Sequence, residues 1–149
     1  MILETRPDGL RPIGYCRHSL ACAIKNGRLP EDMSLEDALA MAQMTDLRLD
    51  LPDPYDYVDE RWDAGERALV VSYLRAGARI VEFRGLSSCR FRCGVDQRVM
   101  GNACLSDGTF TWPEGFAHYL EAHHVRPPEE FVQHALRGGK RIPAASQGV

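Results

Sequence analysis

Asp107-Gly108 lies between two short extended segments, 103–106 and 109–112, and this arrangement predicts a β-hairpin. Aspartate and glycine both accept the positive φ that a type I′ turn needs at its two central positions. Pairing across such a turn would set Ser106 opposite Thr109. Since side chains alternate along a strand, the face expected to point into the core carries Ala103, Leu105, Phe110 and Trp112.

A helix is expected directly after the hairpin. The residue before a proline avoids helical geometry, so Trp112 is expected to be the cap and Pro113 the first helical residue. Glu114 would then lie in the first turn, where the helix dipole stabilises a carboxylate, although Thr111 and Glu114 also fit the spacing of a capping box. The residues on the buried stripe of this helix would be Phe116, Tyr119, Leu120 and His123.

The remaining patterns predict an α+β fold. Helices are expected over 34–45, from 57 or 63 to 77 with Leu69, Val70, Tyr73 and Leu74 on one stripe, and over 128–138. A small antiparallel β-sheet, packed against these helices, is expected from segments 79–84, 88–92 and 103–112. At 149 residues the chain suits a single domain, 1–149, with a tail that frays from about residue 138. Residues 1–30 allow either a strand or a helix.

Two cysteines and two histidines occur in the order typical of a zinc site: Cys89-x₃-Cys93, a hairpin, then His118-x₄-His123 on a helix. The 24 residues between Cys93 and His118 are about double the usual separation. Residues five apart on a regular helix also point about 140° apart, so both imidazoles reach one ion only if the last turn loosens. The competing interpretation is a hydrogen-bonded core histidine beside two packed thiols. Zinc is one hypothesis, with Cys104 and His124 as substitute ligands.

Catalysis is a second hypothesis. Glu114 and His118 are i, i+4 neighbours in the predicted helix, so the carboxylate could orient the imidazole beside a thiol nucleophile such as Cys104 or Cys89. Such a group would suit a small hydrolase or transferase. The sequence has no nucleophile elbow, phosphate loop, dinucleotide fingerprint or HExxH motif. We therefore expect a non-catalytic protein that binds another macromolecule, as inhibitors and immunity proteins do.

Acidic charge is concentrated in one segment. Residues 31–66 hold 12 acidic and 2 basic residues, a formal charge of −10, whereas the rest of the chain holds 9 and 16, a charge of +7. Such a split suits either two parts of one fold that neutralise each other or an acidic surface for a protein with a basic surface. In the second case the partner-binding residues would be Tyr55, Asp56, Tyr57, Asp59 and Trp62. The competing interpretation of this segment is a solvated loop whose aromatic side chains turn inward.

Composition favours a cytoplasmic protein. No apolar run is long enough to span a bilayer, and the N-terminus lacks the apolar region of a secretory signal. Five cysteines in a reducing compartment are expected to be thiols or metal ligands. Four basic residues lie near the second predicted strand: Arg84, Arg90, Arg92 and Arg98. No recognition helix or stacking platform accompanies them, so nucleic acid is not the expected partner.

The last two thirds of the chain carry a long motif string: YVDERWDAGERALVVSYLRAGA (57–78), FRGLSSCRFRCG (83–94) and LSDGTFTWPEGFAHYLEAHHVRPPEEF (105–131). Its pattern, CRFxCG, then DGxxxWPEGxxHY, then HVRxPxEF, resembles that of a recurring group of small, uncharacterised bacterial proteins. This resemblance implies a bacterial cytosolic protein and no particular activity.

Overall fold

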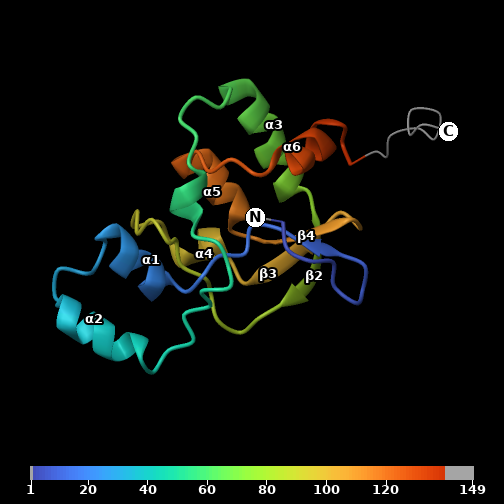
Figure 1. The fold of residues 1–149 in the computed structure, drawn as a ribbon. Helices are drawn as coiled ribbons and strands as arrows, with labels where there is room; N and C mark the ends of the chain where they lie inside the picture. The colour runs from blue at the N-terminus through green and yellow to red at the C-terminus, as the bar shows by residue number, and fades with distance from the viewer. Residues whose placement is uncertain (1, 140–149) are drawn as a thin grey trace.

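The computed structural model describes residues 2–139, in which a small sheet packs against a group of helices and a pair of helices lies at one edge (Figure 1). The helices are α1 (Ser19–Asn26), α2 (Leu35–Ala42), the 3₁₀ helix η1 (Pro54–Tyr57), α3 (Ala64–Arg75), α4 (Gln97–Met100), α5 (Phe116–His123) and α6 (Glu129–Leu136). The strands are β1 (Arg11–Pro12), β2 (Ala78–Glu82), β3 (Ala103–Ser106) and β4 (Phe110–Pro113). The predicted α+β class is confirmed.

The sheet has the strand order β1-β4-β3-β2. Its three longer strands are antiparallel, and the two-residue β1 pairs in parallel with β4. The strand predicted at 88–92 is wrong, because this segment belongs to an irregular loop between β2 and α4. Arg92 adopts a φ of 54°, which breaks extended geometry, and the amide of Arg90 donates to the Tyr119 hydroxyl rather than to a strand.

The hairpin at Asp107-Gly108 is present, but its turn is wider than predicted. Ser106 pairs with Thr111 and not with Thr109. Gly108 has a φ of 90°, whereas Asp107 is not among the described residues with positive φ, so the turn is not type I′. The Asp107 carboxylate instead accepts the amides of Thr109 and Phe110, each at 2.8 Å, and so holds the wider turn. The register has moved by two residues, which keeps the predicted side chains on the core face.

The same carboxylate ties the hairpin to two helices. Its Oδ2 atom accepts a hydrogen bond from the Tyr73 hydroxyl of α3 and lies 2.6 Å from Nε2 of His134 in α6. Burial acts to raise the pKa of Asp107, but the hydrogen bonds from Tyr73, from the turn amides and from His134 outweigh it and lower that pKa. The turn therefore anchors α3 and α6 as well as reversing the chain.

The core lies between the sheet and the group of helices α3, α5 and α6 (Figure 1). Phe110, Trp112, Phe116 and Leu120 are at most 1% exposed, as predicted for the hairpin and the helix that follows it. The Trp112 indole also donates to a backbone carbonyl of α3, at 3.1 Å. Gly77 faces this ring, and a Cβ there would lie 2.6 Å from the indole, so the close approach of α3 and β4 requires glycine at this position.

Helix α5 begins three residues later than predicted, with Gly115 as its N-cap. Pro113 pairs with the opposite strand, and the amide of Glu114 donates to a carbonyl of β3, so strand geometry continues past the proline. The predicted Trp112 cap and the Thr111–Glu114 capping box therefore do not form.

The other helices follow their capping signals. Ser34 caps α2 by accepting the Asp37 amide, and α3 begins after Asp63, the later of its two predicted starts. Leu69 is exposed although it was predicted to lie on the buried stripe, because the buried face of α3 is centred on Val70, Val71 and Leu74.

The two ends of the chain complete the fold. Residues 1–30 contribute both a strand, β1, and a helix, α1. The tail expected to fray from about residue 138 lies, beyond residue 139, outside the described residues. Among residues 2–139, no helix has the length and apolar character needed to cross a bilayer.

Candidate metal centre

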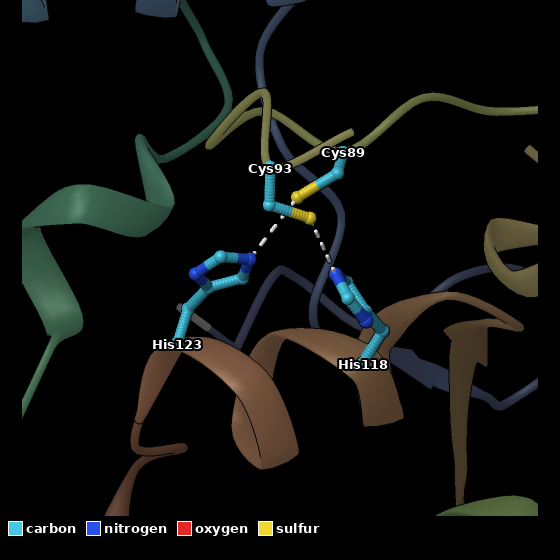
Figure 2. A group of neighbouring side chains, drawn as sticks. All are labelled: Cys89, Cys93, His118 and His123. Atoms are coloured by element: carbon cyan, nitrogen blue, oxygen red, sulfur yellow. Dashed lines mark hydrogen bonds between the residues drawn. The ribbon is translucent and has the colours of Figure 1, made fainter. Parts of the chain in front are cut away.

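An irregular loop between β2 and α4 presents Cys89 and Cys93 on the same side. The carbonyl of Cys89 accepts the amide of Arg92 at 3.0 Å, which closes a turn between the two cysteines. Arg92 and Gly94 both have positive φ, so the chain reverses sharply around Cys93. This tight turn directs both sulfurs towards α5, as Figure 2 shows.

Helix α5 supplies the two histidines from its opposite ends. His123 is the last residue of the helix, and His124 follows it with a left-handed φ of 56°. Although His118 and His123 are five residues apart, both side chains bend towards the loop, and their ring centroids are 5.1 Å apart (Figure 2). The two histidine side chains therefore reach the same place although their positions on a regular helix point about 140° apart.

The four side chains come together as two pairs. The distance from Cys89 Sγ to His123 Nε2 is 3.4 Å, and the distance from Cys93 Sγ to His118 Nε2 is also 3.4 Å. All four ligand atoms lie within 4.8 Å of one another, and neither cysteine forms a disulfide. The group can therefore hold one metal ion.

The protonation of these groups suits metal binding. Burial lowers the pKa of both His118 and His123, which keeps the imidazoles neutral and their lone pairs free. Burial, together with the neighbouring Cys93, raises the pKa of the Cys89 thiol to about 11. Hydrogen bonds from the amides of Phe91 and Cys93 act in the opposite direction, and they would stabilise a thiolate once an ion displaces the proton.

Phe91, in the middle of the loop, positions one of the ligands. Its ring stacks on the His123 imidazole with centroids 4.2 Å apart and planes 6° from parallel. On its other side Tyr55 stacks on Phe91, also at 4.2 Å. The His123 ring is therefore held in a fixed plane. Sequence reasoning did not identify Phe91, although its place between two cysteines was a usable signal.

Arg90 fixes the backbone of the same loop. Its guanidinium donates to the carbonyl of Arg17 at 3.1 Å, to the carbonyl of Ser88 at 2.9 Å and to the hydroxyl of Ser87 at 3.1 Å. Its amide donates to the hydroxyl of Tyr119, which lies on α5. These bonds hold the loop against α5 although the loop is not part of the sheet.

The residues proposed for catalysis have separate partners. Glu114 lies outside α5, so the predicted i, i+4 helix pair with His118 does not form, and its carboxylate accepts from Arg79 at 3.0 Å. Cys104 is buried and accepts the Tyr15 hydroxyl at 3.0 Å. His118 faces Cys93. Glu114 and Cys104 are thus separated from His118, whereas Cys89, the other thiol considered, lies with His118 in the four-residue cluster.

The aromatic side chains assigned to a partner surface turn inward, as the solvated-loop interpretation predicted. Trp62 is buried, and Tyr55 and Tyr57 pack against the core while remaining half-buried. Among the acids, Asp56 pairs with Lys25 at 2.9 Å and Asp59 pairs with Arg126 at 3.0 Å. Much of this segment is therefore neutralised within the molecule.

No protein-family model, curated protein or solved structure matches this chain. The four-residue cluster and its surroundings therefore carry the functional argument.

Proposed function

We propose that this protein is a zinc-stabilised domain in which Cys89, Cys93, His118 and His123 hold one Zn²⁺ ion. The observation that supports this most strongly is the placement of all four ligand atoms within 4.8 Å of one another. A tetrahedral zinc ion with bonds of about 2.3 Å to sulfur and 2.0 Å to nitrogen keeps neighbouring sulfur and nitrogen atoms about 3.5 Å apart. Both sulfur–nitrogen pairs are at 3.4 Å, close to that value.

The donor set favours zinc over other ions. Two thiolates and two neutral imidazoles match a tetrahedral zinc site, whereas calcium and magnesium prefer oxygen ligands. Two thiolate charges also balance the charge of the ion, so a neutral centre would sit in this partly buried place with little electrostatic penalty.

Four protein ligands favour a structural role for the ion. Catalytic zinc keeps one position open for water or substrate, whereas structural zinc is closed by four side chains. The ion would join the irregular loop at Cys89 and Cys93 to helix α5. A structural ion agrees with a protein that acts by binding another macromolecule, as an inhibitor or immunity protein would, rather than with a zinc hydrolase.

Metal analysis tests the proposal. Protein purified without a histidine tag should contain about one zinc per chain by mass spectrometry of its metals. Cys93→Ser and His123→Asn should each lose the ion. Cys104→Ser and His124→Asn are matched controls because they alter a buried thiol and a histidine outside the cluster, and asparagine tolerates the left-handed φ of residue 124.

The controls should keep full zinc content. Wild-type protein with less than about a tenth of an equivalent, or ligand variants that keep their zinc, would overturn the proposal.

A further inference from the structure

Helix α2 is attached to the rest of the molecule by little of its surface. Ala38 is its only buried residue, and the helix packs on α1. Figure 1 places this pair of helices at one edge of the molecule, away from α3 and α6. An eight-residue helix depends on packing for its stability. Because α2 buries only Ala38, its other apolar side chains are available to contact another molecule.

Large apolar side chains are exposed on α2 and beside it. The large hydrophobic side chains exposed on and beside α2 are Leu35, Leu39, Met41, Met44 and Leu49. Met44 is the most exposed, at 86%. Single exposed apolar residues are ordinary, whereas Met41 and Met44 line one groove together, and apolar residues gathered in this way mark interaction sites.

A groove runs along one face of α2. It has a volume of about 430 Å³, and its apolar lining comes from Met33, Ala40, Met41 and Met44. Asp32 and Asp37 provide the polar part of the lining. Asp37, Ala40 and Met41 follow the i, i+3, i+4 spacing of one face of α2, and Met44 lies just beyond the end of the helix. Methionine side chains are flexible and adapt to varied apolar surfaces, which suits a binding groove.

Two acidic residues line the groove, and two more lie next to them in sequence. Within the part of the chain that the structure describes, none of the carboxylates of this group takes part in an ion pair: Glu31, Asp32, Glu36 and Asp37. By contrast Asp53 and Asp59, later in the same acidic segment, pair with Lys25 and Arg126. Part of the excess negative charge of residues 31–66 is thus left at the start of α2.

We propose that the α2 groove binds a basic amphipathic helix of another protein. Apolar side chains of that helix would enter between Met33, Met41 and Met44, and its lysines or arginines would pair with Asp32 and Asp37. An amphipathic helix laid into an apolar groove is a recurrent mode of recognition, and opposite charge on the rim steers the encounter.

Charge disfavours the other occupants of the groove. A second copy of this chain that docked through the same face would bring two acidic rims together. Anionic lipid headgroups and nucleic-acid phosphates would be repelled in the same way. The proposal concerns α2 alone and does not depend on the metal centre.

A fluorescent, 18-residue helical peptide of leucine and lysine, with leucine on one face, serves as the probe. Wild-type protein should bind it more tightly than a matched leucine–glutamate peptide. Met44→Ser and Asp32→Asn should each weaken binding by about fivefold, and the double variant by more. Both positions lie outside α2, so the variants should remain folded by circular dichroism.

Leu69→Ser and Glu4→Gln are the matched controls, because they remove an exposed leucine and an exposed acid elsewhere, and they should leave binding unchanged. Amide resonances of residues 31–45 should shift on titration. Binding that ignores both groove variants, equal binding of the acidic peptide, or shifts confined to other residues would overturn the proposal. Self-association abolished by Met44→Ser would assign the groove to a second copy and would also overturn it.

Discussion

Replacing Phe91 by alanine should damage both the stability of the protein and the metal centre. The Phe91 side chain is 7% exposed and lies between Tyr55 and His123, with a ring centroid 4.2 Å away on each side. Truncation of a buried phenylalanine leaves a cavity and costs about 3–5 kcal/mol of unfolding free energy. For a chain of 149 residues, a loss of about 4 kcal/mol lowers Tm by about 12 °C.

The volume and the aromatic ring of Phe91 have separable effects. Phe91→Leu keeps most of the volume and should cost about 1.5 kcal/mol. Both variants lose the stacking that fixes the His123 imidazole, so both should bind zinc about 10-fold to 100-fold more weakly, as expected when a group that orients a ligand is removed.

Urea denaturation followed by tryptophan fluorescence, with a zinc chelator present so that zinc affinity does not enter the unfolding free energy, measures the packing cost, and competition with a chromophoric chelator measures the affinity. A cost below about 1 kcal/mol for Phe91→Ala, or a leucine variant as unstable as the alanine variant, would refute the packing argument. Unchanged zinc affinity in both variants would refute the positioning of His123 by Phe91.

Three further predictions use other parts of the fold. A zinc chelator should lower the Tm of wild-type protein but not that of Cys93→Ser, measured by differential scanning fluorimetry, since only the wild type has an ion to lose. Gly77→Ala should cost about 1–3 kcal/mol in urea denaturation because its Cβ meets Trp112, whereas Gly85→Ala, which has open space, should be close to neutral. Asp107→Asn should be less stable than wild type at pH 7. Because the folded pKa of Asp107 is lowered, its stabilisation is present above the unfolded pKa and is lost as pH falls through the folded one. The gap between the two proteins should therefore shrink below about pH 4, and a gap independent of pH would contradict this assignment.

Local chemistry made the hairpin and its core face predictable. Asp107 and Gly108 are strong turn residues. The predicted and the observed registers differ by two residues, so the alternation of side chains places Phe110 and Trp112 in the core in both. Ser34 and Asp63 likewise marked helix starts through their own side-chain hydrogen bonds. These features depend on residues a few positions apart, so the sequence alone contains them.

Features set by distant contacts were not predictable. The residues around Phe91 resemble a strand, but Tyr55 and His123 hold the ring, and Arg90 bonds its loop to α5 and to Arg17, far away in sequence. Helix α5 starts late because strand pairing continues past Pro113.

The metal cluster was predictable from the sequence in part. The order of cysteines and histidines suggested the four residues, whereas the helical angle between His118 and His123 argued against them. Their convergence required the bend of both side chains and the fold of the loop, and a sequence pattern contains neither (Figure 2).

Zinc K-edge X-ray absorption of the purified, untagged protein tests the proposed centre most directly, because it identifies the ligand atoms. The arrangement of Cys89, Cys93, His118 and His123 predicts two sulfur neighbours at about 2.3 Å and two imidazole nitrogens at about 2.0 Å. A shell without sulfur, or one filled by oxygen, would contradict the zinc centre proposed for these four residues.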